Sequence, residues 1–209
     1  MAESGKFQVL NLEEIINRAR FPFFMGLLQG NIERDLPKRQ LTIYVKNEAL
    51  FEYFHDFFTE LFGIYPQLVT RSNKNYNKEF CFYYPKLLEA IRQLTLNNTQ
   101  PPYSLLKTEN PILKYFRGFF YRTGHVGYHA RMNERTLKPK KYPYVIINKR
   151  NTNLLSGIVT LLNSLKIRVL SYPCSIIIQH KDALDKLLNL RLLPTKKQEY
   201  LESLVSHID

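Results

Sequence analysis

The chain has 209 residues, of which 44% are hydrophobic and 23% charged, so it can bury the core of one large or two small globular domains. Its net charge of +12 favours an anionic partner, nucleic acid before an acidic membrane surface, over the alternative of a basic surface that is merely solvated. Two cysteines without a CxxC pair argue against a disulfide framework or a structural zinc site and fit a reducing compartment. No apolar leader is visible, which predicts an intracellular protein. No window reaches the roughly 18 apolar residues that a membrane span needs, so we expect no membrane span.

The first half of the sequence predicts alternating helices and strands. A short helical segment at residues 13–21, whose role stays open, precedes them. Pro22 suits a first helical turn because proline has no N–H to lose there, and the apolar–polar alternation of residues 41–46 is typical of a strand. In chain order we expect a helix, a strand, a helix, two strands and a helix, at residues 21–32, 40–47, 50–61, 66–72, 79–85 and 87–94.

The second half follows the same plan with two strands after its first helix, and we interpret each half as α-β-β-α-β-β-α. Its first helix has Pro111 near the start with Asn110 as the predicted N-cap, and the segment HVGYHARM alternates as a strand does. A polar linker with a proline pair separates the halves, which predicts a first repeat at residues 1–96, a linker at 97–109 and a second repeat at 110–209. The elements of the second repeat, including one additional C-terminal helix, are expected at residues 111–123, 125–132, 142–149, 154–165, 168–172, 174–180, 183–190 and 195–208.

The first helix of each half carries one internal glycine, Gly26 or Gly118. A glycine inside a helix is less favourable than alanine by about 1 kcal/mol, so such a position usually has a packing reason. The simplest reason is the close approach of another helix. We therefore expect the two helices to pack on each other at these glycines.

The segments FFMGLLQGNI and YFRGFFYRTGHV resemble the motif of the LAGLIDADG homing endonucleases, in which an apolar helix with a glycine leads to an acid and a second glycine. The segment LTIYVKNEALFEYFHDFFTELFGI is similar to the strand and helix that follow this motif in the family. The two motifs stand in register, and the resemblance covers roughly residues 21–190. The chain is thus similar to the two-repeat, single-chain members of that family.

The resemblance implies an α+β fold of two α-β-β-α-β-β-α repeats related by a pseudo-twofold axis. The two motif helices would pack along this axis, and their lower ends would bring one carboxylate from each repeat to a divalent metal ion. Two antiparallel sheets would form a saddle whose concave face lies on duplex DNA. One chain would then act as a monomer with internal symmetry.

The sequence departs from the family at both positions of the metal-binding acid. Carried over residue by residue, the acid of the first repeat falls on Asn31 and that of the second on Thr123. Mg²⁺ prefers carboxylate and water oxygens, and a neutral amide and a hydroxyl cannot replace two negative charges. We therefore predict no catalytic residue, no metal and no cofactor, and hence a protein that is not an enzyme.

Neighbouring side chains offer little to restore such a site. Glu33 and Asp35 follow the first motif but are expected to point elsewhere, and the second repeat has no acid between Tyr115 and Asn133. Instead, Arg122 stands in this turn. A cation there suits packing and a phosphate contact rather than a metal ion.

Basic side chains, with tyrosines between them, gather on predicted strands and hairpins of both halves. Lysine and arginine supply salt-dependent phosphate contacts, and a β-ribbon can enter the major groove of DNA. His125 and His129 share a strand face, where contact with nucleic acid or solvent is favoured over a metal pair, and Cys81 and Cys174 are interpreted as buried, small apolar residues. The predicted nucleic-acid-binding residues are Arg34, Lys38, Arg39, Tyr44, Lys46, Arg71, Lys74, Lys78, Arg122, His129, Arg131, Arg135, Lys138, Lys140, Lys141 and Lys149.

Together these observations favour a non-catalytic nucleic-acid-binding protein derived from a homing endonuclease, with duplex DNA as its first partner and a regulatory or accessory role. Three alternatives stay open. One is a maturase that binds folded RNA and assists intron splicing, a role that the loss of cleavage would not harm. The others are a structural subunit with a protein partner and a residual metal-dependent endonuclease.

Overall fold

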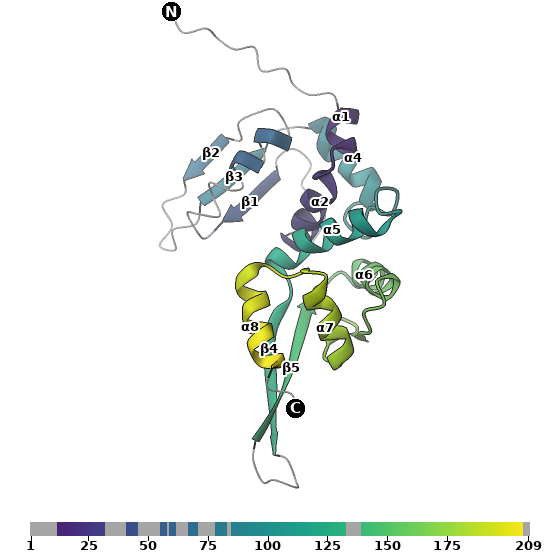
Figure 1. Ribbon diagram of the computed structural model, residues 1–209. Helices are drawn as coiled ribbons and strands as arrows, with labels where there is room; N and C mark the ends of the chain where they lie inside the picture. The colour runs from purple at the N-terminus through teal and green to yellow at the C-terminus, as the bar shows by residue number, and fades with distance from the viewer. Residues whose placement is uncertain are drawn as a thin grey trace, which may run out of the picture. The chain divides into compact units, whose positions relative to one another are not determined.

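The computed structural model describes residues 12–31, 41–45, 55–57, 59–61, 67–70, 78–82, 85–132 and 139–206 (Figure 1). By its packing the chain divides into two compact units. Unit 1 comprises Met1–Phe21 and Leu36–Gln93, and unit 2 comprises Pro22–Asp35 and Leu94–Asp209. The first motif helix therefore packs within unit 2, together with the second half of the chain. The boundaries expected between the two sequence repeats concern similarity rather than packing, and they stay a prediction.

Unit 1 contains a three-stranded antiparallel sheet with the strand order β1-β3-β2. Helix α4 buries Leu87, Leu88 and Ile91, whose helical spacing places them on one face. Of the helix expected at residues 50–61, residues 55–57 and 59–61 are described and helical. The elements are α1 (Leu12–Asn17), β1 (Leu41–Val45), β2 (Gln67–Thr70), β3 (Lys78–Phe82) and α4 (Pro85–Thr95).

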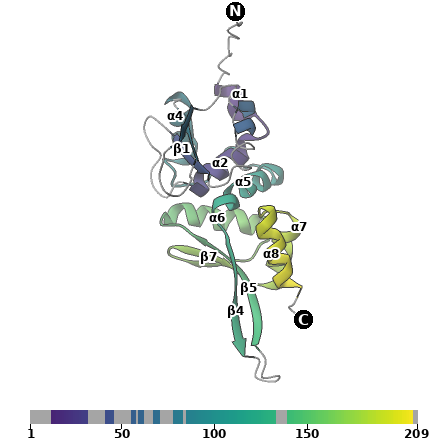
Figure 2. The ribbon, with the colours of Figure 1, turned by 90° about the vertical axis from the view of Figure 1, so that its left-hand side faces the viewer.

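Unit 2 is built on a four-stranded antiparallel sheet with the strand order β4-β5-β7-β6. All eight residues of β4 pair with β5, and the outer ends of both strands run beyond the helices of this unit (Figure 1, Figure 2). The strands expected from the sequence are confirmed, although β5 begins earlier than predicted. They are β4 (His125–Met132), β5 (Pro139–Asn148), β6 (Leu170–Tyr172) and β7 (Ser175–Ile178).

The helices of unit 2 follow the apolar pattern of the sequence. Helix α6 starts at an Asn151 cap, whose side chain accepts the Leu154 N–H at 3.0 Å, and it lies against β7, while α8 lies against β4 and β5. The inward-facing strand residues Val145, Ile147 and Ile176 are fully buried. The helices are α2 (Phe21–Asn31), α5 (Glu109–Arg122), α6 (Thr152–Ser164), α7 (Lys181–Asn189) and α8 (Thr195–Val205).

The order of elements from α5 to α7 is the α-β-β-α-β-β-α order predicted for a repeat. In the first repeat α2, β1, β2, β3 and α4 occur in the expected sequence. None of the described helices is both long enough and apolar enough to cross a membrane.

Two local predictions differ from the structure. Helix α5 begins at Glu109 with Thr108 as its N-cap residue, so Asn110 lies inside the first turn. Cys174 is exposed in the turn between β6 and β7, so it is not a buried strand residue. Threonine and asparagine both suit an N-cap, so residue type did not distinguish Thr108 from Asn110. Cysteine occurs in strands and in turns, so residue type did not place Cys174 either. The side chain of Cys81 lies outside the described part of the structure.

Candidate nucleic-acid interface

Helices α2 and α5 cross at the two glycines that stand out in the sequence. A Cβ atom on Gly26 would run into the backbone carbonyl of Tyr115, and a Cβ atom on Gly118 would run into that of Phe23. Only hydrogen fits at either position, so the two backbones are in direct contact. This crossing forms the rigid base from which β4 leaves the helix pair.

A buried chain of polar groups links the same two helices. The hydroxyl of Tyr115 donates to Oε1 of Gln29 at 2.7 Å, and the Gln29 amide donates to the carbonyl of Gln100 at 2.8 Å. Burial, and secondarily the nearby Tyr103, raises the pKa of Tyr115 well above its usual value, so the phenol keeps the proton that it donates. These buried hydrogen bonds hold the two helices in one register.

The C-terminal end of α5 is closed by groups of the protein itself. Thr123, where the resemblance implies an acid, is 5% exposed, and its hydroxyl donates to the carbonyl of Phe119 at 2.7 Å. Nζ of Lys197 on α8 donates to the carbonyls of Phe120 and Thr123, at 2.9 and 2.6 Å. The last carbonyls of a helix lack intrahelical partners and carry partial negative charge, which an ammonium group offsets.

Two cations lie close together at this end of α5. Burial, and secondarily the charge of Arg122, together lower the pKa of Lys197 to about 8. The guanidinium of Arg122 is itself partly buried, which lowers its pKa from the ordinary value. Arg122 remains at an exposed position, as a phosphate contact requires.

The end of α2 has a similar arrangement. Nζ of Lys149, which directly follows β5, donates to the carbonyl of Gly30 at 2.8 Å, and the residue is 6% exposed. Lys149 was predicted to bind nucleic acid, but a side chain held in this way is withdrawn from solvent. We therefore leave it out of the candidate interface. Asn31 is the last residue of α2, and its side chain lies outside the description.

The pairing of β4 with β5 sorts the exposed side chains between two faces. Directly opposed residues of antiparallel strands share a face. His129 opposes Tyr142 and Arg131 opposes Lys140, whereas Lys141 opposes Ala130 on the reverse face. The reverse face continues into buried core residues such as Val145, so the helices cover its inner part. We call the other side the open face of the ribbon, which is formed by His125, His129, Arg131, Lys140, Tyr142 and Tyr144.

Aromatic rings and cations alternate along this ribbon. On the open face the His129 ring stacks on Tyr144 with centroids 4.5 Å apart, and the Arg131 guanidinium lies 6.0 Å from the centre of the Tyr142 ring. On the reverse face Nζ of Lys141 lies 4.7 Å from the Tyr128 ring. These contacts hold flexible cations above rigid rings at exposed positions. A polyanion can therefore contact these cations with little further loss of side-chain conformational freedom.

Several predicted contact residues cannot be placed. Tyr44 and Lys78 belong to β1 and β3, whose side chains are not described. The remaining ones lie outside the described residues and are Arg34, Lys38, Arg39, Lys46, Arg71, Lys74, Arg135 and Lys138. Glu33 and Asp35, which follow the first motif, also lie outside them.

The structure also gives roles to residues that sequence reasoning missed. Lys197 closes the end of α5, Gln29 links α2 to α5, and Tyr144 stacks on His129. For Tyr144 the strand alternation held a usable signal, because it shares the parity of Tyr142. Lys197 and Gln29 carried no local signal, since their partners lie 74 and 86 residues away in the chain.

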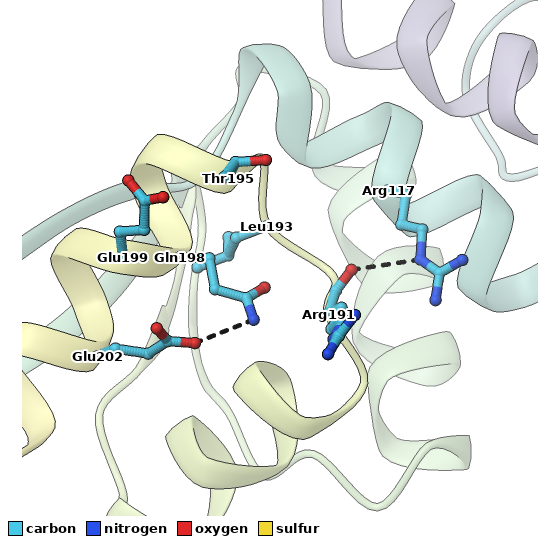
Figure 3. Close-up of a pocket in the computed structure, with 7 residues that line it drawn as sticks. All are labelled: Arg117, Arg191, Leu193, Thr195, Gln198, Glu199 and Glu202. Atoms are coloured by element: carbon cyan, nitrogen blue, oxygen red, sulfur yellow. Dashed lines mark hydrogen bonds between the residues drawn. The ribbon is translucent and has the colours of Figure 1, made fainter.

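An open groove of about 560 Å³ lies beside α8 (Figure 3). Two of its lining side chains complete the C-terminal end of α7. Arg117 donates to the carbonyls of Arg191 and Leu190, at 3.2 and 3.3 Å, and Gln198 donates to that of Leu188 at 3.3 Å. The groove is thus lined in part by groups that cap a helix, which gives Arg117 and Gln198 a structural role.

No model of a known protein family matches the sequence, and no curated protein sequence matches it. Several solved structures are similar to the chain. The homing endonuclease I-WcaI bound to its DNA recognition sequence is 15% identical with a TM-score of 0.60, covering 96% of this chain and 94% of that chain. A variant of I-DmoI in complex with nicked target DNA and manganese is 15% identical with a TM-score of 0.57, covering 88% and 97%.

A third structure is similar to the same extent. The LAGLIDADG meganuclease I-AabMI bound to uncleaved DNA is 14% identical with a TM-score of 0.58, covering 88% of this chain and 90% of that chain. Identities this low carry the fold and not the chemistry. The paired glycine helices, the antiparallel sheets and these similarities together show that the chain has the LAGLIDADG homing endonuclease fold.

Proposed function

We propose that this protein binds duplex DNA through the open face of the β4–β5 ribbon and does not cleave it, in a regulatory or accessory role. The observation that carries the proposal is the contrast within unit 2. Arg131 stands exposed on the ribbon beside Tyr142, whereas Thr123 and Lys197 close the helix end where an acid is implied.

The ribbon has the properties that a duplex requires. A two-stranded ribbon fits the major groove, where side chains reach base edges, and flanking cations contact phosphates. His129, Arg131 and Lys140 lie together on the open face. The net charge of +12 favours the same partner. The three similar structures described above were each solved with DNA, which supports a duplex as the ligand.

The end of α5 supports the non-cleaving part of the proposal. Metal-assisted hydrolysis needs anionic oxygens that hold the ion. Thr123 contributes a hydroxyl that already donates to Phe119, and the neighbouring charges of Arg122 and Lys197 are positive. Within the described ranges, histidine, cysteine, aspartate and glutamate side chains form no cluster of three or more that could hold a metal ion.

The proposal is tested by measuring binding and cleavage on the same preparation. Fluorescence anisotropy with a labelled duplex, a single strand and a folded RNA gives affinities over a range of salt concentrations. We expect the duplex to bind best, with an affinity that falls steeply with salt and is the same in EDTA and in Mg²⁺. Supercoiled plasmid incubated with Mg²⁺ or Mn²⁺ should stay intact.

Three results would overturn it. Absence of duplex binding at low salt would leave a structural role. Tighter binding of folded RNA would assign the maturase role instead. Metal-dependent nicking that disappears in Glu33→Gln would show that an acid outside the motif position restores cleavage.

A further inference from the structure

The end of α5 is the place where the resemblance implies a divalent metal ion, and three of its carbonyl oxygens already accept hydrogen bonds. The Phe119 carbonyl accepts the backbone N–H and the hydroxyl of Thr123, at 3.2 and 2.7 Å. The carbonyls of Phe120 and Thr123 accept Nζ of Lys197. One ammonium thus bridges two carbonyl oxygens, as a coordinated cation would.

The charge at this end of α5 also opposes a metal ion. Lys197 and Arg122 are both cations, and they are close enough for the Arg122 charge to disfavour protonation of Lys197. A divalent ion among them would meet repulsion from both, while Mg²⁺ requires anionic or water oxygens. The residues present here therefore do not fit the metal that the fold family implies.

The partner helix ends in the same way. Lys149 donates to the Gly30 carbonyl near the end of α2, from a position that is almost completely buried. Each helix of the crossing pair therefore ends on a lysine side chain supplied by a distant part of unit 2. Cations at helix C-termini are stabilising because they offset the partial charge of the last carbonyls.

We infer that Lys197 takes the place of a divalent metal ion at the end of α5, so that this chain holds the root of β4 with an internal ammonium and binds no metal there. Gly124, with φ +71°, turns the chain directly after Thr123, and β4 begins at His125. Lys197 thus ties α8 to the point where the ribbon starts. The inference deepens the proposed non-cleaving function. It rests on that proposal only where it relates the missing metal ion to the loss of cleavage.

Two measurements on the free protein test the inference. In the first, thermal unfolding compares Lys197→Met with Lys196→Met, which removes the same charge from an exposed neighbouring position of α8. We expect the midpoint to fall by roughly 3–8 °C for Lys197→Met, because two carbonyls lose their donor, and to stay unchanged for Lys196→Met. Equal midpoints for the two variants would overturn the inference.

The second measurement locates a metal ion directly. Mn²⁺ is added at one equivalent to the isotope-labelled wild-type protein, and the amide signals of Thr123, Gly124 and His125 are followed by NMR. We expect these signals to keep their widths, because no paramagnetic ion settles beside them. Selective broadening of the three signals would place a metal at this helix end and overturn the inference.

Neither measurement uses DNA. Failure to bind a duplex would therefore remove the proposed function while the inference about Lys197 stands. Mn²⁺ bound at Thr123 would remove the inference while a measured duplex affinity stands.

Discussion

Unit 2 places its cations in two different surroundings. At the ends of the helix pair, Lys149 and Lys197 donate to helix carbonyls, and Lys149 is buried while Lys197 is half-buried. On the outer ribbon, Arg131 and Lys141 occupy exposed positions beside tyrosine rings. The comparison teaches that the surroundings of a cation, and not its residue type, separate charges that support the fold from charges that can meet a ligand.

The contrast holds along a single strand. Lys141 lies in the outer part of β5 and Lys149 directly after its inner end. The outer part runs beyond the helices, while the inner end lies at the carbonyls of α2 (Figure 2). Lys141 and Lys149 therefore have different roles because the helix layer covers only one end of the strand.

The helix pair should respond most strongly to a change in its crossing. Gly118→Ala places a methyl group against the Phe23 carbonyl, and a clash with backbone cannot be relieved by a side-chain rotation. We expect the free energy of unfolding to fall by about 3 kcal/mol, measured by urea denaturation. Ser156→Ala, at an exposed position of α6, is the control and should change it little. A Gly118→Ala protein as stable as this control would show that the helices do not cross so closely.

Lys149, directly after β5, should separate stability from binding. Lys149→Met leaves the Gly30 carbonyl without this buried donor, so unfolding should become easier by about 1–3 kcal/mol. Arg150→Met, at the exposed next position, should leave stability unchanged. Duplex affinity, measured at a temperature where the variant is folded, should stay close to that of the wild type. A large loss of affinity at full stability would return Lys149 to the interface.

The open face should carry more of the binding than the reverse face. Arg131→Ala should weaken duplex binding about fivefold to tenfold and make the log–log salt slope shallower by about one, because one phosphate contact is lost. Lys141→Ala on the reverse face should have a smaller effect. Lys107→Ala, at an exposed position ahead of α5 and so at the opposite end of that helix from the ribbon, is the control. Equal losses for Arg131→Ala and Lys107→Ala would mean that net charge, rather than this face, binds DNA.

The smallest expected effect is the pH dependence of the stability that Lys197 contributes. Its pKa is about 8 in the folded protein against an ordinary 10.5, because burial opposes the charge. Between these values the unfolded chain binds a proton that the folded protein has released, so stability rises with pH across this window and is flat below it. The neutral amine still has two N–H groups for the two carbonyls. The difference in unfolding midpoint between wild type and Lys197→Met should therefore grow from pH 7.5 to pH 10, and a constant difference would contradict the assignment.

Much of the fold could be predicted from the sequence. Apolar spacing placed α6 and α7, alternation placed β4, and the internal glycines marked Gly26 and Gly118 as sites of close approach. These signals are local, because each depends on residues within a few positions of one another. The start of α5 and the place of Cys174 were wrong, since neighbouring residues there satisfy more than one turn geometry.

The candidate site was less predictable. The sequence marked Thr123 as a position without its acid, but it held no sign that Lys197 would close the same helix end from 74 residues away. It also grouped Lys140, Lys141 and Lys149 as equivalent cations. Strand pairing places Lys140 and Lys141 on opposite faces, and Lys149 donates to the Gly30 carbonyl near the end of α2.

By itself, then, the amino-acid sequence determined the order of elements, the excess of positive charge and the lack of a carboxylate at Asn31 and Thr123, where the resemblance implies one. These properties follow from residue types and short spacings. The tertiary structure alone decided which cations are buried and which remain exposed, because burial and hydrogen bonding depend on the segments that folding brings together. The division between a self-capped helix pair and a cationic ribbon is a property of the packed molecule.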